Sequence, residues 1–545
     1  MNRSLLVVSL LLAAAAGTLA ARTAAPRSEP AQQLQGPTDS WPTYNGDYSG
    51  RRFSPLTKIS ATNVGALSLA WMFRINLPQG TPAIRIAGTP LQIDGVMYFT
   101  IPDHVWAIDA RSGREIWHHV WKSEGGIHIG NRGVGILGDT LYVETADCNL
   151  VALNLKDGKE RWRKTICDLD QFFFGSTAPI IVKNHVITGI SGDDLDRAGY
   201  IQSHDPVTGK MQWRWYVVPQ KMGDPGSETW PNEDAMKHGG GMTWQPITYD
   251  PELNLIYVVT GNPQPVIAHK NRAGANLYTE SIVALNPDTG KMVWYFQASP
   301  HDTHDWDATQ VPVLFDGEVN GQKRKLLAQA SRNGFFFVLD RATGKNISTS
   351  EFVKTNWSKG IDAKGQPIPN PAKEPQLDGA LVTPNQYGAT NWPPPSFSPD
   401  TGLFYVNAFR AFSIYYIYDP DDNPQGWGGT DRGGWQEAMM QAIDYKTGKI
   451  RWSHKWEGGG SRSGVLSTAG NLVFTGDGTN NFVALDARTG EALWHANLGA
   501  GVANGPITYE LDGAQYVVTG AGDTLYGFVM HAKDSPRQLS QKSQR

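Results

Sequence analysis

The stretch "AIDARSGREIW", residues 107–117, carries the three features that decide the fold. An apolar segment leads into Asp109, a glycine stands at position 113, and a tryptophan follows at position 117. Glycine adopts the positive φ angles that tight turns require, and short apolar segments on both sides of such a turn are typical of paired β-strands. The stretch therefore predicts a β-hairpin whose second strand begins near the tryptophan.

The same unit recurs along most of the chain. Further short strands precede the hairpins, such as "GVMYFT" at 95–100 and "NLIYVVTG" at 254–261. Four short strands per repeated unit are the pattern of one β-propeller blade. The seven copies read "AIDARSGREIW" from Ala107, "ALNLKDGKERW" from Ala152, "SHDPVTGKMQW" from Ser203, "ALNPDTGKMVW" from Ala284, "VLDRATGKNIS" from Val338, "AIDYKTGKIRW" from Ala442 and "ALDARTGEALW" from Ala484.

The copies are unevenly spaced, which indicates insertions between them. The segment "SLAWMF" at 68–73 supplies an eighth tryptophan position, and the C-terminal strands "GPITYE", "AQYVVTGAG" and "TLYGFVM" can join it to close a ring. We predict an all-β fold: a single eight-bladed β-propeller of four-stranded antiparallel blades with tryptophan-containing repeats, over residues 41–533. Closure of the ring would protect the sheet edges.

The ends of the chain have a different composition. Residues 1–20, "MNRSLLVVSLLLAAAAGTLA", combine a basic start, an apolar run and small residues near Ala20, which predicts a cleaved secretory signal peptide and a periplasmic protein. A retained anchor is the alternative, and no later segment is apolar for long enough to span a membrane. We expect residues 21–40 and 534–545 to be disordered. The net charge of -4 gives no indication of nucleic-acid binding.

The chain contains two cysteines, Cys148 and Cys167. In an oxidising compartment they can form a disulfide, or they can be two separately buried thiols. Two cysteines in this spacing exclude a C-x-x-C-H heme attachment motif.

The run "YDPELNLIYVVTGNP" at 249–263 and the tryptophan-bearing repeats resemble the pyrroloquinoline quinone (PQQ)-dependent alcohol dehydrogenases of the methanol/ethanol dehydrogenase family. The resemblance extends from "RRFSPLTKISATNVGALSLAW" at 51–71 to "NGPITYELDGAQYVVTGAG" at 504–522. It implies a periplasmic enzyme that oxidises a small alcohol to an aldehyde by hydride transfer to a metal-activated quinone. Because the chain has no heme motif, a separate periplasmic cytochrome c would accept the electrons.

The resemblance also implies a binding site for PQQ. Trp244 matches the tryptophan on which the quinone stacks, and Arg332, before Asn-Gly, matches a basic residue beside the reactive carbonyl. Without the resemblance, Trp244 could be an ordinary core residue and Arg332 an ordinary turn residue. The other positions at which the family binds the cofactor are Arg132, Thr145, Ser191, Gly192 and Asn391.

The stretch "PHDTHDWDATQ", residues 300–310, matches the segment that carries the catalytic base of the family, which falls on Asp305. The family's metal ligands fall on Asp194, where glutamate is more usual, and on Asn262. Asp307 stands two positions after the base, as in lanthanide-using members, so the cation would be a lanthanide ion or Ca²⁺. A solvated turn aspartate is the alternative for Asp307. In an extended segment, residues two apart share a face, so Asp305 and Asp307 could hold one ion.

Several positions depart from the family. The adjacent cysteine pair over the quinone would fall at Gly126 and Ile127, and a cofactor-contacting glutamate and threonine are replaced by Ala87 and Met242. These changes allow a remodelled pocket. They keep two alternatives open: a quinone-binding module, and a non-catalytic propeller that acts as an envelope-assembly scaffold.

The histidines of "HDTHD", His301 and His304, have no ligand role in the family. Imidazole suits transition metals better than calcium, so a zinc site is the competing interpretation. We expect the histidines to orient the loop by hydrogen bonds or to face the substrate.

Overall fold

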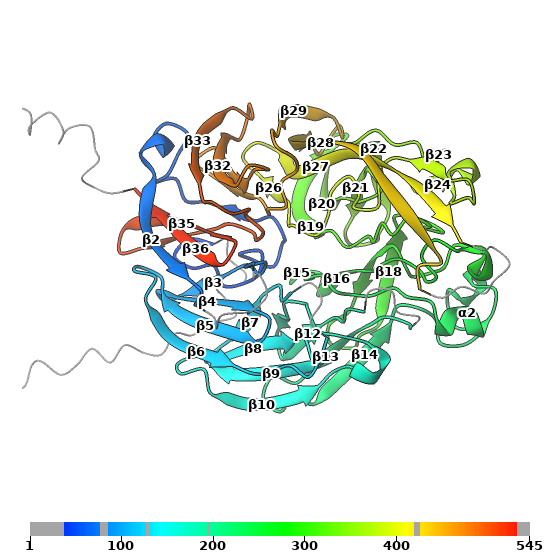
Figure 1. Ribbon diagram of the computed structural model, residues 1–545, viewed down its shortest axis with the longest axis horizontal. Helices are drawn as coiled ribbons and strands as arrows, with labels where there is room; N and C mark the ends of the chain where they lie inside the picture. The colour runs from blue at the N-terminus through cyan, green and yellow to red at the C-terminus, as the bar shows by residue number, and fades with distance from the viewer. Residues whose placement is uncertain (1–36, 77–84, 127–129, 193–196, 419–425, 531–545) are drawn as a thin grey trace, which may run out of the picture.

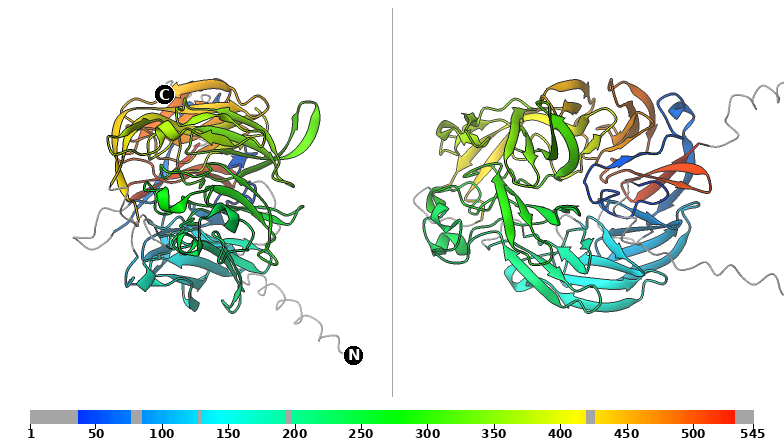
Figure 2. Two further views of the ribbon diagram at one scale, coloured as in Figure 1. Left: turned by 90° about the vertical axis from the view of Figure 1, so that its right-hand side faces the viewer. Right: turned by 180° about the vertical axis from the view of Figure 1, so that it is seen from behind.

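The computed structural model describes residues 37–76, 85–126, 130–192, 197–418 and 426–530. In these ranges the chain forms eight sheets of four or five strands and one two-stranded sheet. The larger sheets follow one another around a central axis, and the view from behind shows the same ring (Figures 1 and 2). The predicted all-β class is confirmed, and the one α-helix among the described residues is the short α2 (Glu233–Lys237).

Four sheets make up the first half of the ring. Their strands are β3 (Leu91–Ile93), β4 (Val96–Ile101), β5 (His104–Asp109) and β6 (Glu115–Val120); β7 (Val134–Leu137), β8 (Thr140–Thr145), β9 (Asn149–Asn154) and β10 (Glu160–Thr165); β11 (Ile180–Val182), β12 (His185–Thr188), β13 (Tyr200–His204) and β14 (Met211–Tyr216); and β15 (Thr248–Asp250), β16 (Leu255–Val259), β17 (Ser281–Leu285) and β18 (Met292–Gln297).

Three further sheets follow in chain order. Their strands are β19 (Val313–Val319), β20 (Gln322–Ala330), β21 (Phe335–Asp340) and β22 (Asn346–Glu351); β25 (Ala380–Val382), β26 (Ser396–Ser398), β27 (Leu403–Ile417), β28 (Gly429–Asp444) and β29 (Ile450–Lys455); and β30 (Leu466–Thr468), β31 (Leu472–Gly476), β32 (Asn481–Asp486) and β33 (Ala492–Asn497), which β1 (Phe53–Ser54) extends. The two-stranded sheet pairs β23 (Ser358–Ile361) with β24 (Pro367–Pro369).

The remaining sheet joins the two ends of the described chain. Strand β2 (Ser68–Arg74) pairs antiparallel with β36 (Thr524–Val529), which continues to β35 (Ala514–Ala521) and β34 (Ile507–Leu511). The predicted pairing of "SLAWMF" with the C-terminal strands is therefore present.

Tryptophans connect neighbouring sheets. The indole of Trp117, on β6, donates a hydrogen bond to the Leu155 carbonyl at 3.1 Å, in the hairpin turn of the next sheet. At the end of that turn Gly158 has a φ of 69°, and a Cβ there would lie 2.6 Å from the indole. Two independent reasons therefore favour glycine at position 158: the backbone is left-handed, and a side chain would clash with the indole ring. The same contact joins Trp71 with Gly113, Trp162 with Gly209, Trp213 with Gly290, Trp294 with Gly344 and Trp452 with Gly490.

Two steps around the ring differ from this pattern. The copy at 338–348 ends in serine, and Ser350 on β22 donates to the Gly448 carbonyl at 3.2 Å. Trp494 on β33 donates to the Leu67 carbonyl at 3.1 Å, immediately before β2. This last bond links the sheet of β30–β33 to the sheet that contains both ends.

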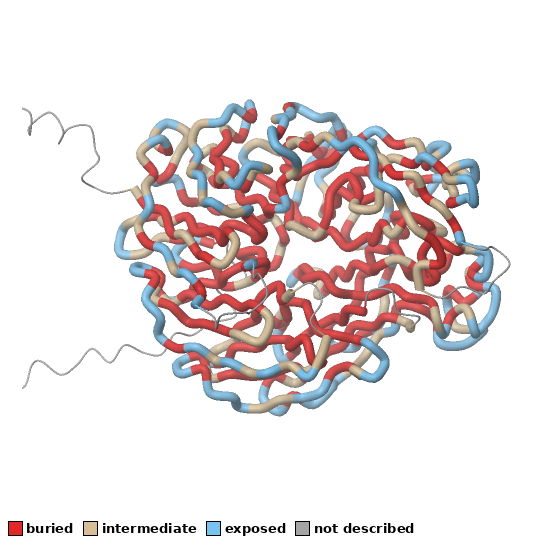
Figure 3. Tube along the Cα trace, viewed as in Figure 1, coloured by how far each residue is buried: buried red, intermediate tan, exposed pale blue. Residues whose placement is uncertain are grey.

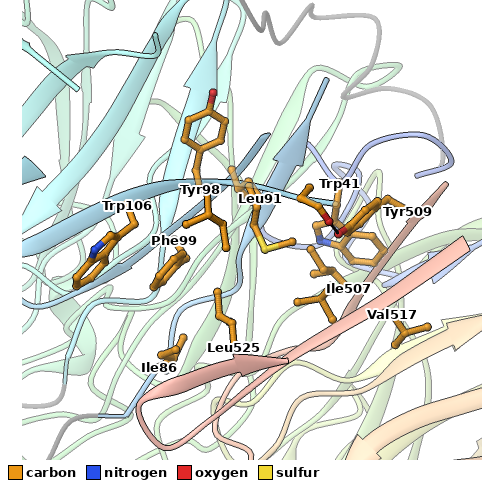
Figure 4. Packing of buried hydrophobic residues seen from close by; sticks show 14 of the residues in the cluster. Trp41, Ile86, Leu91, Tyr98, Phe99, Trp106, Ile507, Tyr509, Val517 and Leu525 are labelled. Atoms are coloured by element: carbon orange, nitrogen blue, oxygen red, sulfur yellow. Dashed lines mark hydrogen bonds between the residues drawn. The ribbon is translucent and has the colours of Figure 1, made fainter. Parts of the chain in front are cut away.

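The apolar residues lie between adjacent sheets. Most residues in the strands are buried, whereas many of the outer loops are exposed (Figure 3). Figure 4 shows one such interface, where side chains of β4 and β5 and of the C-terminal strands belong to one buried cluster. The labelled residues are Trp41, Ile86, Leu91, Tyr98, Phe99, Trp106, Ile507, Tyr509, Val517 and Leu525.

The N-terminal boundary of the fold lies earlier than predicted. The Pro37 carbonyl accepts a hydrogen bond from the Ser54 hydroxyl at 2.9 Å, and the Thr38 carbonyl accepts from the Glu510 amide at 2.8 Å. Residues 37–40, which we expected to be disordered, are therefore fixed to the fold by their backbone. The predicted signal peptide at 1–20 and the tail at 534–545 lie outside the described residues, and no helix among the described ones is long and apolar enough to span a membrane.

Cys148 and Cys167 form a disulfide, which decides between the two alternatives that the sequence leaves open. The bond closes a loop between residues separated by 19 positions. Closing a loop of this length reduces the entropy of the unfolded chain.

We expect the double substitution Cys148→Ser and Cys167→Ser to lower the free energy of unfolding by about 3 kcal/mol. Chemical denaturation of the variant and the wild type, with and without a reducing agent, measures the difference. Reductant should destabilise the wild type alone, and an unchanged wild type would show that the bond does not contribute.

Candidate active site

A cavity of about 370 Å³ lies where loops from most of the sheets meet. Its wall has charged, aromatic and glycine residues, which come from loops far apart in the sequence. The lining residues are Arg85, Ala87, Gly130, Arg132, Gly192, Gly240, Gly241, Met242, Trp244, Asn262, Gln264, Asp305, Asp307, Arg332, Gln386, Tyr387, Asn391, Trp392, Trp427 and Arg462.

Arg332 is the centre of the charged part of this wall. It lies in the turn between β20 and β21, is 4% exposed, and binds Asp307 at 2.9 Å and Asp305 at 3.3 Å through different nitrogens. Burial opposes its charge, but Asp305 and Asp307 outweigh this effect and raise the pKa of Arg332. The arginine stays charged and holds both carboxylates at the cavity.

Each aspartate has a second partner. The other carboxylate oxygen of Asp307 accepts a hydrogen bond from the backbone N–H of Asn262 at 2.8 Å. The Gln386 side chain donates to Asp305, and the Gln386 carbonyl accepts from Arg332 at 2.7 Å. Asn262, Asp305, Asp307 and Arg332 thus form one connected polar cluster, although they come from three separate segments.

The backbone at Asp305 is left-handed, with a φ of 63°, so the segment is not the extended strand that would put Asp305 and Asp307 on one face. The two side chains reach the same cavity by a turn instead. Asp302 supports this turn, because its buried carboxylate accepts hydrogen bonds from the backbone amides of His304 and Trp306, each at 3.2 Å.

The two histidines of the stretch position the loop. The ring of His304 stacks on Trp306 with centroids 4.3 Å apart, and its Nε2 lies 3.0 Å from the Lys373 carbonyl. His301 contacts the Gly274 carbonyl at 2.7 Å and His269 at 3.0 Å. Burial and Arg272 lower the pKa of His301 to about 4, which keeps its ring neutral at physiological pH. Among the described residues there is no group of three or more His, Cys, Asp or Glu side chains that could hold a metal ion.

Trp244 and Arg132 form another part of the wall. The Arg132 guanidinium carbon lies 4.4 Å from the Trp244 ring centroid and 5.4 Å from that of Trp392. Arg132 also donates to the Ser176 hydroxyl at 2.6 Å, which is 2.6 Å from the hydroxyl of Ser191. The cavity therefore has indole rings and a buried cation at this end.

The structure brings most of the predicted site residues together at the cavity. Ser191 does not line the cavity, but its hydroxyl lies 2.6 Å from that of Ser176, which binds Arg132. Thr145 does not line the cavity either, and its hydroxyl donates to Asp147 in its own turn. Asp194 lies outside the described residues. The predicted residues that line the cavity are Arg132, Gly192, Trp244, Asn262, Asp305, Asp307, Arg332 and Asn391.

The departures from the family also fall at or near the cavity. Ala87 and Met242 line it. Gly126 has a φ of 78°, and a Cβ there would lie 2.1 Å from the Ala146 carbonyl oxygen, so a cysteine does not fit this position without a shift of the backbone. Ile127 lies outside the described residues.

Sequence reasoning missed a buried acid behind the site. Glu280 is fully buried at the start of β17, and neither carboxyl oxygen has a hydrogen-bond partner among the described residues. Burial, reinforced by Asp302 and Asp307, raises its pKa well above the ordinary value, so the group is a neutral acid. The sequence feature that could have indicated this buried acid is a glutamate directly before "SIVAL", the apolar segment of β17.

The residues present suit the cofactor and cation that the resemblance implies. A planar quinone with carboxylates requires a flat aromatic surface and cations, which Trp244 and Arg132 offer. The oxygen atoms of Asn262, Asp305 and Asp307 are hard donors of the kind that calcium-sized ions prefer.

Glu144 on β8 is a second buried acid. Burial raises its pKa to about 8, against an ordinary value of 4.5, while the Thr177 amide donates to it at 2.6 Å. At pH values between 4.5 and about 8, the Glu144 carboxyl keeps its proton in the folded protein but loses it in the unfolded chain. The free energy of unfolding therefore falls as the pH rises through this range. The replacement Glu144→Gln removes this dependence.

We expect Glu144→Gln to unfold at about the same denaturant concentration as the wild type at pH 4.5, and to be more stable by a few kcal/mol at pH 8. Denaturation at a series of pH values measures the difference. The exposed Glu115→Gln is the control, and an equal pH dependence in Glu144→Gln and the wild type would contradict the prediction.

Comparisons with known proteins identify the family of the chain. Residues 41–378 and 430–517 match the PQQ family model described as the glucose/ethanol/alcohol dehydrogenase β-propeller domain. The chain is 36% identical to the quinohemoprotein alcohol dehydrogenase ADH IIB of Pseudomonas putida over 94% of its own length and 78% of the relative's. It is also 36% identical to the quinoprotein alcohol dehydrogenase PedH of Pseudomonas putida, over 96% and 92% of the two chains.

Two solved structures have the same fold. The quinohemoprotein alcohol dehydrogenase ADHIIG of Pseudomonas putida HK5 superimposes with a TM-score of 0.86 and 33% identity, over 93% of this chain and 83% of the other. A europium-containing methanol dehydrogenase superimposes with a TM-score of 0.82 and 29% identity, over 90% and 98%. The chain therefore belongs to the family of PQQ-dependent alcohol dehydrogenases.

Proposed function

We propose that this enzyme oxidises a primary alcohol to an aldehyde, with Asp305 as the base and PQQ with a lanthanide ion or Ca²⁺ in the cavity. The observation that carries the proposal is the cluster in which Arg332 holds both Asp305 and Asp307 at a cavity that also contains Trp244. When bound, the quinone would accept the hydride of the alcohol, and the cation would make its carbonyl more electrophilic.

The residues of the chain have separate roles in this proposal. Asp305 accepts the hydroxyl proton of the alcohol at its carboxylate, which Arg332 and Gln386 hold in one orientation. Arg332 stabilises the negative charge that develops beside it. Trp244 and Arg132, with Gly192 and Asn391, hold the cofactor, while Ser191 supports Arg132 through Ser176. Thr145 supports the turn that it shares with Asp147.

Oxygen donors from Asn262, Asp305, Asp307 and Asp194 would hold the cation. Asp307 adds a second carboxylate to the described part of this set, and a trivalent ion gains more from an added negative ligand than a divalent ion does. The similarity to a europium-containing methanol dehydrogenase supports the same choice. We therefore propose a lanthanide ion as the preferred cation.

The proposal includes the surroundings of the enzyme. The eight sheets act as the eight blades of one propeller, the N-terminal segment directs the protein to the periplasm, and a separate cytochrome c accepts the electrons. One relative, from Thauera butanivorans, is described as a 1-butanol dehydrogenase (cytochrome c), which supports such an acceptor.

The function is tested by reconstituting the apoprotein with PQQ and either lanthanum or calcium, followed by measurement of alcohol-dependent dye reduction. We expect Asp305→Asn to lower kcat by about 1,000-fold with both ions, because the base is lost, and to bind PQQ as the wild type does. The exposed Asp400→Asn is the matched control. A wild type without activity under either ion would contradict the proposed function, and an active Asp305→Asn would contradict the role of the base.

The choice of cation is tested separately with Asp307→Ala. We expect it to lower the lanthanum-supported activity at least 10-fold more than the calcium-supported activity, because a trivalent ion depends more on the added carboxylate. Calorimetric titration of both ions into the PQQ-loaded variant measures binding independently of turnover. Equal losses with the two ions would assign Asp307 to the support of Arg332 rather than to cation choice.

A further inference from the structure

Four arginines line the cavity, but the site described above uses two of them. Arg132 and Arg332 are each 4% exposed and are bound by Ser176 and by the two aspartates, respectively. Arg85 and Arg462 line the same cavity and are exposed. Their exposure indicates that they lie at its entrance, away from the buried end formed by Trp244.

Among the described residues, the entrance arginines have no acidic partner. Asp305 and Asp307 are the carboxylates among the described lining residues, and Arg332 binds both. In the part of the chain that the structure describes, neither Arg85 nor Arg462 forms an ion pair. Two guanidinium groups without counter-charges at a cavity favour an anionic ligand.

Tyr387 adds a hydroxyl donor to these two cations. The Arg462 guanidinium carbon lies 5.2 Å from the Tyr387 ring centroid, and the ring packs edge-on against Phe409 at 5.1 Å. The Tyr387 hydroxyl is shielded from solvent and has no hydrogen-bond partner among the described residues. Burial raises the pKa of Tyr387, while Arg462, Arg332 and Arg85 act in the opposite direction. The hydroxyl is therefore a neutral donor on a ring that lies beside Arg462 and lines the same cavity as Arg85.

We propose that Arg85, Arg462 and Tyr387 form a subsite for a carboxylate, so that the preferred substrate is an alcohol that carries a carboxylate at the end remote from its carbinol. A carboxylate accepts hydrogen bonds from guanidinium and hydroxyl groups at once, which matches these three donors. The alcohol end of such a substrate would extend inward toward Asp305. The inference rests on the proposed function for its chemistry.

A carboxylate of the cofactor is the other source of the same chemistry. The observations favour the substrate, because Arg132 already places a cation on the Trp244 ring at the buried end of the cavity. The entrance arginines are exposed, as groups that meet an incoming substrate would be. Removal of the arginines distinguishes the two sources. It weakens the binding of PQQ if the carboxylate belongs to the cofactor, and it raises KM for the charged alcohol if the carboxylate belongs to the substrate.

The test compares 4-(hydroxymethyl)benzoate with 4-methylbenzyl alcohol, which have the same carbinol and similar size but differ in charge. With the PQQ-loaded wild type we expect kcat/KM to be at least 10-fold higher for the carboxylate, and the preference to weaken in 0.5 M salt. Arg462→Ala and Arg85→Ala should each raise KM for the carboxylate about 10-fold, with a far smaller effect on the neutral alcohol. Tyr387→Phe, which keeps the ring contacts, should raise KM for the carboxylate substrate about 3-fold. Arg410→Ala, which removes another exposed arginine stacked on an aromatic ring, is the control.

Binding is measured independently of turnover with 4-methylbenzoate, by calorimetry on the loaded protein. Arginine-dependent binding without turnover of either alcohol would support the subsite and overturn the proposed function. Turnover of both alcohols without a preference for the carboxylate would overturn the subsite alone. Weaker PQQ binding by the arginine variants, with equal losses on the two alcohols, would assign the arginines to the cofactor and overturn the inference.

Discussion

The contact between an indole ring and a glycine of the next sheet is the interaction on which the rest of the structure depends. Six tryptophans make it, and in each case a Cβ on the glycine would fall within 3 Å of the ring. Because the indole N–H also donates to a carbonyl of the same turn, as Trp117 does to Leu155, the distance and the angle between sheets are both fixed. Repeating one fixed step turns separate sheets into a ring, and the ring brings their inner loops together.

The charged cluster is a consequence of this convergence. Asp305 and Asp307 lie in the loop after β18, and Arg332 lies in the turn after β20. A buried charge requires a partner, and the two ion pairs supply one for each of these groups. Together they neutralise much of one another's charge while they keep oxygen atoms at the cavity. The same region includes Glu280, a neutral acid, and Asp302, whose pKa lies below its ordinary value because hydrogen bonds and nearby positive charges outweigh the effect of burial. Such a separation of roles by environment is typical of active sites.

Sequence reasoning identified the residues with the strongest local motifs. Asp305, Asp307, Arg332 and Trp244 stand in recognisable stretches, and the cavity contains all four. It missed Glu280, Arg85, Arg462 and Tyr387, since an isolated residue in a loop gives no sign of which other loop it faces. The reasoning that put Asp305 and Asp307 on one face of a strand also failed, because the backbone at Asp305 is left-handed. Thr145, which was also predicted at the site, donates its hydroxyl hydrogen bond to Asp147 in its own turn and does not line the cavity.

The sequence by itself determined the repeated hairpin, because the glycine of each copy is a local requirement of its turn and apolar segments flank that turn. It also determined the all-β class and, through the resemblance, the chemistry expected of the stretch at 300–310. Only the tertiary structure decided that the two cysteines are joined, which loops share the cavity, and that two of the four arginines in its described lining are exposed and form no ion pair with a described residue. These properties depend on distances between segments far apart in the chain. Such distances follow from the packing of whole sheets, which no single motif contains.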